Sequence, residues 1–161
     1  MAPPPPGSHQ QFNERIAAVA AAIGDRRLDA ALGLWLNATF PPHGEAFRDL
    51  AALIDSGCAE GWLCQREAGG IKFGRAVKPG EDAGRFSVDV VRMDNVAGPH
   101  HVHPHGEIGM IVPVSGAPEF DGNGAGWYVY GPGSAHRPTV TGGAAYVLYL
   151  LPDGAIEFTG E

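Results

Sequence analysis

The chain has 161 residues, enough for one domain with a buried core, and its hydrophobic content of 44% is ordinary for a globular protein. Its formal net charge of -7, from 11 basic and 18 acidic residues, disfavours a nucleic-acid partner, because such proteins need a basic surface. No apolar run reaches the roughly 18 residues of a membrane-spanning helix, so no membrane partner is expected.

The start of the chain and its two cysteines favour a cytoplasmic protein. The first residues are rich in proline and lack the basic and apolar regions of a signal peptide, so we expect a disordered tail over residues 1–9. Two cysteines are too few for a secreted disulfide framework. Cys58 and Cys64 are therefore predicted to be buried free thiols in a reducing compartment.

Residues 10–59 carry helical patterns. Apolar residues recur at steps of four, three and four, as one face of a helix requires; they are Phe12, Ile16, Val19 and Ile23. Two further helices are expected over residues 28–36 and 45–54, and Pro41 and Pro42 break the chain between them. We expect this helical segment to cap a core or a subunit interface.

From residue 60 onward the pattern changes to short strands and tight turns. Alternating or apolar β-branched runs occupy residues 71–77, 86–92, 108–114, 127–130, 145–151 and 155–158. Most of the 24 glycines lie in this half, where tight turns need them. This pattern predicts an antiparallel sandwich or barrel over residues 60–161.

A histidine-rich stretch carries the clearest chemical signal. Residues 98–107 read Gly-Pro-His-His-Val-His-Pro-His-Gly-Glu, so that His101, His103 and Glu107 form an H-x-H-x3-E pattern. Alternate residues of an extended chain point to the same side, so the two histidines can reach one ion. His136, which follows a proline-glycine turn, can complete a set of four ligands. Such ligands suit one divalent transition-metal ion, such as Fe, Mn, Zn or Ni.

The alternative is that these histidines belong to a solvated loop or to a hydrogen-bonded core. Their alternation inside the chain distinguishes them from a purification tag and favours the metal. His105 has the same parity as the two ligands, but Pro104 turns the chain there, so His105 is expected at the rim of the site.

The same segments resemble the two motifs of the cupin superfamily. Residues 98–107 with the closing Gly116 are similar to the first motif, and residues 126–136 are similar to the second, with its glycine, proline, glycine and final histidine. The resemblance implies a mainly β fold, a cupin-type double-sheet jelly-roll β-barrel over residues 60–161, with the N-terminal helical segment outside it. By analogy with cupins, a homodimer is expected.

A wider set of segments resembles the 4-hydroxylaminobenzoate lyase family. They lie at residues 70–75, 86–91, 98–101, 126–127, 139–143 and 151–158. The resemblance implies an enzyme that converts 4-hydroxylaminobenzoate to 3,4-dihydroxybenzoate and ammonia in nitroaromatic catabolism. Its partner would be a small aromatic carboxylate.

That reaction suggests roles for further residues. His105 is the candidate catalytic residue, as a proton relay near neutral pH. Arg75 and Arg92 are candidates for binding the substrate carboxylate, because each shares parity with apolar positions and arginine offers a two-pronged donor. Aromatic residues that could stack on the benzoate ring are Trp127, Tyr128, Tyr130, Tyr146 and Tyr149.

Three other functions fit the same ligand set. A metal-dependent dioxygenase acting on a thiol or an aromatic ring would stop without oxygen, whereas a lyase would not. A non-catalytic cupin would bind a small molecule and turn nothing over. An isomerase acting on a sugar or keto acid would need polar groups for hydroxyls, where these strands supply mainly aromatic residues. The fold alone does not choose among them.

Overall fold

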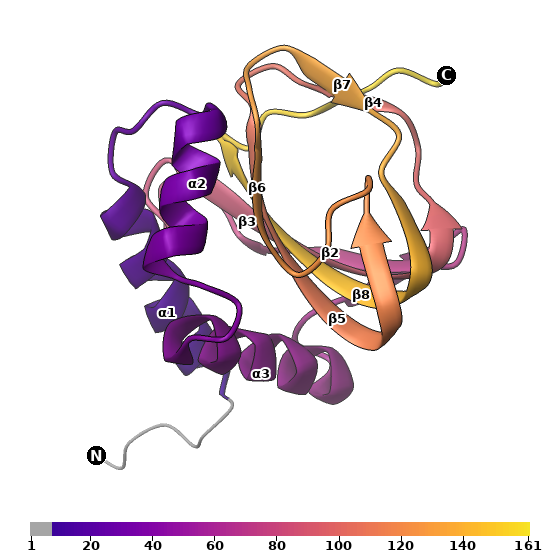
Figure 1. Ribbon diagram of the computed structural model, residues 1–161, viewed down its shortest axis with the longest axis horizontal. Helices are drawn as coiled ribbons and strands as arrows, with labels where there is room; N and C mark the ends of the chain where they lie inside the picture. Colours follow the sequence, from indigo (N-terminus) through magenta and orange to yellow (C-terminus); the bar gives the residue numbers. More distant parts are fainter. Residues whose placement is uncertain (1–7) are drawn as a thin grey trace.

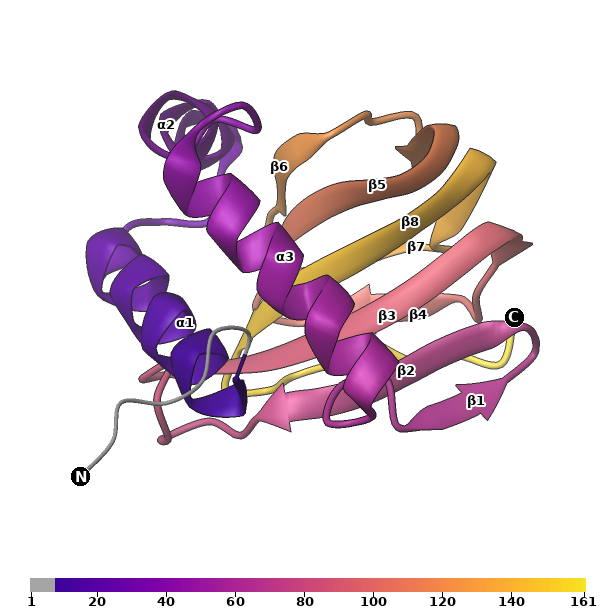
Figure 2. The same ribbon diagram turned by 90° about the horizontal axis from the view of Figure 1, so that it is seen from below.

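The computed structural model describes residues 8–161 and, within that range, has three layers (Figure 1). Three helices cover one face of a six-stranded sheet, and a sheet of three short strands lies across the other face (Figures 1 and 2). The tail predicted over residues 1–9 lies outside the described residues up to position 7. Ser8 caps the first helix and His9 begins it.

The helices follow the apolar pattern of the N-terminal segment. They are α1 (His9–Ile23), α2 (Ala30–Thr39) and α3 (Glu45–Glu60). Asp29 caps α2, because its side chain accepts a hydrogen bond from the backbone N–H of Leu32 at 3.0 Å. The predicted face of α1 is buried in an apolar cluster that it shares with the other helices and the sheet. No helix in the described range is long and apolar enough to cross a membrane.

All strand pairings are antiparallel. The large sheet has the order β1-β2-β3-β8-β5-β6, with β1 Arg66–Ala68, β2 Ile71–Val77, β3 Phe86–Ala97, β8 Thr139–Pro152, β5 Glu107–Phe120 and β6 Gly126–Tyr130. The small sheet has the order β7-β4-β9, with β7 Ser134–His136, β4 His101–His103 and β9 Glu157–Phe158. The predicted mainly β class is confirmed; the two sheets face each other as in a jelly roll without closing into one continuous barrel.

Side chains of the large sheet alternate between its two faces. Val90, Met110 and Leu148 point toward the helices and share one apolar cluster with them. Val91 and Val147 point the other way, into a second cluster beneath the small sheet. Burying an aliphatic side chain of this size stabilises the fold by about 1.5–3 kcal/mol. We call these the helix face and the pocket face of the large sheet.

The prediction of free thiols is wrong. A disulfide joins Cys58, in the last turns of α3, to Cys64 just beyond the helix. Gly61 ends α3 in the left-handed region at φ 87°, which folds the chain back along the helix. The two Cα atoms therefore lie 5.3 Å apart, inside the range of about 4.4–6.8 Å that a disulfide spans.

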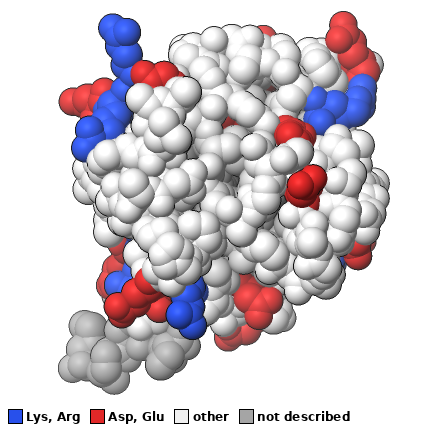
Figure 3. All heavy atoms as spheres, in the orientation of Figure 1, with Lys and Arg blue, Asp and Glu red and all other residues white. Residues whose placement is uncertain are grey.

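Charged side chains lie mostly at the periphery of the face seen in Figure 3. Lys and Arg side chains there form small groups with Asp and Glu beside them, and most of the centre is uncharged. This visible face therefore presents no continuous basic surface.

Candidate functional site

Two short strands of the small sheet bring three histidines together. In β4, His101 and His103 both point inward and are buried, with Val102 between them pointing outward. The pairing of β4 with β7 places His101 opposite His136. The turn after β4 is fixed by Gly106, which has a φ of 89° and donates its backbone N–H to the carbonyl of His103.

The ring nitrogens of the three histidines converge. Nε2 of His103 lies 3.0 Å from Nε2 of His101 and 3.0 Å from Nε2 of His136. One ligand atom from each residue lies within 4.8 Å of the others. Glu107, the first residue of β5, places Oε2 3.5 Å from Nε2 of His103 and 3.8 Å from Nε2 of His136. The structure thus brings all four predicted metal ligands to one place.

Hydrogen bonds on the far side of two rings assign their tautomers. Nδ1 of His101 lies 3.0 Å from the carbonyl oxygen of Pro99, which can only accept, so this nitrogen carries the hydrogen. Nδ1 of His136 lies 2.6 Å from Oδ2 of Asp121 and donates to that carboxylate. In its neutral form each of these two rings therefore presents the Nε2 lone pair to the centre of the cluster, as metal ligation requires.

Burial opposes charge on His101, His103 and Glu107. Burial, and then the neighbouring His136, lowers the pKa of His101 to about 4. Burial, and then the other two imidazoles, lowers the pKa of His103 to about 3. Burial raises the pKa of Glu107 to about 8, and its Oε2 has no hydrogen-bond partner among the described residues. Lone pairs and a carboxylate oxygen without a donor form a set that a divalent cation would complete, so these residues fit a metal ion.

Asp121 is a functional candidate that the sequence did not reveal. Its Oδ2 accepts hydrogen bonds from His136 and, at 2.7 Å, from the hydroxyl of Tyr130, while Oδ1 accepts from the backbone N–H of Thr139. Burial alone would raise the pKa of the Asp121 carboxyl, but these hydrogen bonds outweigh it and hold the pKa below its usual value. Asp121 therefore stays anionic and orients the ring of His136.

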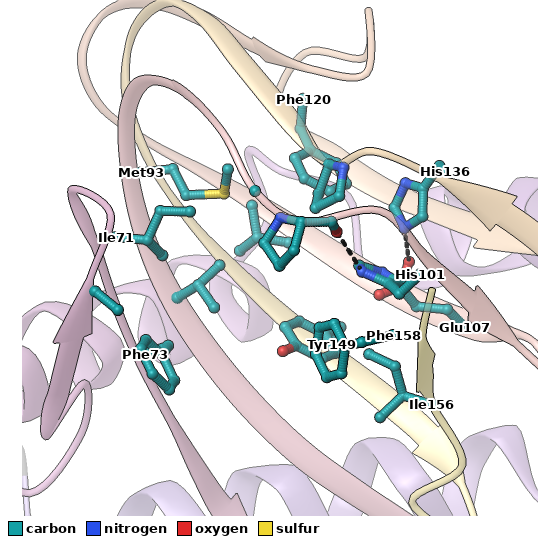
Figure 4. A pocket seen from close by; sticks show the side chains of 16 residues that line it. Ile71, Phe73, Met93, His101, Glu107, Phe120, His136, Tyr149, Ile156 and Phe158 are labelled. Carbon is teal, nitrogen blue, oxygen red and sulfur yellow. Dashed lines mark hydrogen bonds and ion pairs between the residues drawn. The ribbon is translucent and has the colours of Figure 1, made fainter. Parts of the chain in front are cut away.

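A mostly apolar pocket of ≈ 230 Å³ lies between the two sheets beside the cluster. His101, His136 and Glu107 lie at one end, and the apolar walls extend away from them (Figure 4). The labelled apolar lining residues are Ile71, Phe73, Met93, Phe120, Ile156 and Phe158. The pocket exceeds the roughly 150 Å³ of a cavity that binds benzene, so one aromatic ring fits.

The two arginines predicted to bind a carboxylate do not line this pocket. Arg92 lies on the helix face, opposite Tyr146 in the strand register, and the hydroxyl of Tyr146 binds Asp55 of α3. Arg75 belongs to the pocket face but is held by Asp89, with Nε 3.2 Å from Oδ1. Its guanidinium also reaches the carbonyl of Gly154.

His105 is not brought to the cluster. It lies in the turn between β4 and β5 with an exposed side chain, 4.0 Å from Oδ2 of Asp153. It borders a surface hollow beside Arg26 and Arg85 rather than the apolar pocket. The structure therefore gives the predicted proton relay no contact with a ligand in the pocket.

The aromatic candidates divide between the two faces. Trp127 packs against Phe40 on the helix side, and its Nε1 donates to the Phe40 carbonyl at 2.9 Å. Tyr146 also faces the helices. Tyr128, Tyr130 and Tyr149 belong to the cluster of the pocket face, and of the five aromatic candidates only Tyr149 lines the pocket itself.

Comparisons with known proteins give a consistent result over most of the chain. Residues 14–158 match the family model described as PnbB, 4-hydroxylaminobenzoate lyase. A protein from Nocardioides sp. (strain LMS-CY) named 4-hydroxylaminobenzoate lyase is 36% identical over 145 residues, covering 84% of this chain and 86% of that protein. A protein of the same name from Pseudomonas putida is 31% identical over 155 residues, covering 86% of this chain and 88% of that protein.

Solved structures show a more distant likeness. An oxalate oxidase in complex with glycolate has a TM-score of 0.44 and 20% identity, over 58% of this chain and 57% of that one. The polyketide cyclase RemF from Streptomyces resistomycificus has a TM-score of 0.44 and 14% identity, over 57% of this chain and 72% of that one.

Proposed function

We propose that this chain, which belongs to the 4-hydroxylaminobenzoate lyase family and is an enzyme, converts 4-hydroxylaminobenzoate to 3,4-dihydroxybenzoate and ammonia. We propose also that the reaction depends on a divalent transition-metal ion held by His101, His103, His136 and Glu107. The observation that carries the proposal is the convergence of imidazole lone pairs and an unpartnered carboxylate oxygen at one end of an apolar pocket.

The overall reaction explains why such a site is useful. One water is added and one ammonia leaves, while the N–O bond breaks and the ring gains oxygen, so no net oxidant or reductant is needed. A metal ion bound here would supply Lewis acidity toward the hydroxylamino oxygen and lower the pKa of a bound water.

The residues of the chain supply binding, orientation and shielding. Pro99 and Asp121 hold His101 and His136 with Nε2 directed at the cluster. Glu107 brings a carboxylate into the pocket wall, at the end where the hydroxylamino group would lie. The apolar walls exclude water from the aromatic ring, so that the reacting polar group lies at the end of the pocket that holds Glu107.

The direct test is product formation without oxygen. Purified protein is stripped with a chelator, reloaded separately with Fe(II), Mn(II), Zn(II) or Ni(II), and incubated anaerobically with 4-hydroxylaminobenzoate. We expect at least one metal to restore equal amounts of ammonia and 3,4-dihydroxybenzoate. Turnover only when oxygen is admitted would support the dioxygenase instead, and bound substrate without any product would support a non-catalytic protein.

A pair of variants on one strand links this activity to the cluster. Glu107→Gln removes the buried carboxylate and should lower ammonia release strongly, whereas Glu119→Gln alters an exposed residue of the same strand and should leave it unchanged. Equal activity of the two variants would remove Glu107 from the site.

A further inference from the structure

Tyr149 supplies the one polar side chain of the pocket lining apart from the cluster, within the described part of the chain. The lining contains His101, His136 and Glu107 from the cluster; its other side chains are apolar except for the Tyr149 hydroxyl. No Lys or Arg lines the pocket, and residues 1–7, which the structure does not describe, contain neither type. A carboxylate entering this pocket would therefore find no Lys or Arg side chain on the described walls.

The Tyr149 hydroxyl is free to donate. It has no hydrogen-bond partner in the described chain. The hydroxyls of two other tyrosines already donate to protein groups: Tyr130 donates to Asp121 and Tyr146 donates to Asp55. In Figure 4 the ring of Tyr149 lies between Glu107 and Phe73, and its oxygen points away from the histidines, toward the Phe73 side.

The strand register explains why the Tyr149 hydroxyl has no hydrogen-bond partner. Tyr149 pairs with Asp89 of β3 on one side and with Gly109 of β5 on the other. Asp89 is held by Arg75, with contacts of 3.2 and 3.4 Å, and makes no hydrogen bond to the Tyr149 hydroxyl. Gly109 has no side chain, and the ring of Tyr128 fills the space above it. The hydroxyl is thus left facing the cavity.

We propose that Tyr149 determines which aromatic substrates the pocket accepts, by donating a hydrogen bond from its hydroxyl to the ring carboxylate. The inference rests on the proposed function for the identity of the substrate. A para-substituted ring has its two polar groups at opposite ends. With the hydroxylamino group at the cluster, the carboxylate lies on the side of the ring toward which the hydroxyl points. A carboxylate without a donor in an apolar pocket is strongly disfavoured, so one well-placed hydroxyl has a large effect on selectivity.

The test uses binding probes that do not react. Binding of 4-aminobenzoate and of aniline is measured by titration calorimetry with metal-loaded wild type and Tyr149→Phe. A hydrogen bond to a charged group contributes enough that Tyr149→Phe should weaken 4-aminobenzoate binding about 10-fold or more. Binding of aniline, which has no carboxylate, should change less than about 2-fold. Kinetics should agree: Tyr149→Phe should raise KM for 4-hydroxylaminobenzoate with kcat little changed, and should not raise KM for hydroxylaminobenzene, which has no carboxylate.

Two control variants separate this role from structural effects and from an ion pair. Tyr146→Phe removes a hydroxyl three residues away on the opposite face and should leave both probes unchanged. Arg92→Gln should also leave them unchanged, because Arg92 lies on the helix face, opposite Tyr146. Equal weakening of both probes by Tyr149→Phe, no weakening of either, or selective weakening by Arg92→Gln would overturn the inference. The binding result stands whether or not ammonia is released, so failure of the proposed reaction is recognised separately.

Discussion

The two faces of the six-stranded sheet are built by the same strands but are organised differently. On the helix face, apolar side chains pack against three helices, and polar tips such as the Tyr146 hydroxyl and the Trp127 ring nitrogen have partners at 2.8 and 2.9 Å. On the pocket face, the buried Glu107 Oε2 has none, and a cavity adjoins it. Packing on one face stabilises a fold that can hold an unsatisfied polar cluster on the other.

The largest expected effect comes from removing a ligand on the pocket face. His103→Ala deletes the ring whose Nε2 lies 3.0 Å from both other imidazoles. Bound metal should fall from about one ion per chain to none, and ammonia release should fall more than about 100-fold, beyond the effect of losing an outer partner. His43→Ala, in the loop between α2 and α3, is the control. A His103→Ala protein that retains its metal and activity would show that the pocket face does not hold the metal site.

A smaller loss is expected from Asp121→Asn, which changes a residue behind the ligands. The amide can still accept from Thr139, but its N–H₂ group would face Nδ1 of His136. That ring would then move its hydrogen to Nε2 and turn a donor toward the cluster. Metal affinity and kcat/KM should each fall about 10–100-fold. Asp94→Asn, at an exposed site on β3, should change neither, and equal behaviour of the two variants would exclude this role for Asp121.

Changes on the helix face should affect stability and spare the site. Leu148 is fully buried and pairs with Val90 and Met110. Leu148→Ala should lower the free energy of unfolding by about 2–5 kcal/mol, measured by urea denaturation. The metal affinity of the folded protein should not change. Val147→Ala, on the pocket face beside it, should be less destabilising but should weaken binding of 4-aminobenzoate, because Val147 lines the pocket. Loss of metal binding in a stably folded Leu148→Ala protein would show that the two faces are not independent.

The smallest effect is a pH dependence of the metal-free protein. Because burial raises the pKa of Glu107 from 4.5 to about 8, its contribution to stability is present at low pH and is lost as the pH rises toward 8. Burial lowers the pKa of His101 and His103 from 6.5, so their contribution is present above 6.5 and is lost as the pH falls toward 4. Stability of the chelated protein should therefore decline from pH 6.5 to 8.

That decline should vanish in Glu107→Gln, which has no carboxylate to ionise, and should shrink when metal is bound, because the cation then partners the carboxylate. Thermal unfolding at several pH values measures it. An identical decline in the chelated wild type and in Glu107→Gln would assign the effect to other groups.

Local spacing explains why most of the cluster could be predicted from the sequence alone. His101 and His103 alternate along one extended strand, and Glu107 follows a glycine turn, so their proximity depends on a few bonds of known geometry. His136 comes from a distant strand, so spacing alone does not predict its position; its residue type after a proline-glycine turn suggested it as the fourth ligand, and the resemblance to a two-motif family supported that choice. Asp121 left no such signal, because its contact with His136 depends on how a turn after β5 packs.

The substrate-binding arginines show the limit of strand parity. Parity correctly groups Arg92 with Val88 and Val90, but β3 is buried on both faces, so the pattern does not say which face carries the site. Arg75 lies on the neighbouring strand β2, and its side chain belongs to the pocket face, where Asp89 holds it. The disulfide was not predicted because the sequence analysis used the number of cysteines, whereas the bond depends on the left-handed turn at Gly61.

Three imidazoles and Glu107 are proposed to hold a metal ion on which the lyase activity depends. Stepwise addition of one divalent metal to chelated wild-type protein, with bound metal and anaerobic ammonia release measured on the same samples, tests this dependence. We expect activity to rise in proportion to occupancy and to level off at about one ion per chain. Full ammonia release from protein with no bound metal would contradict the claim.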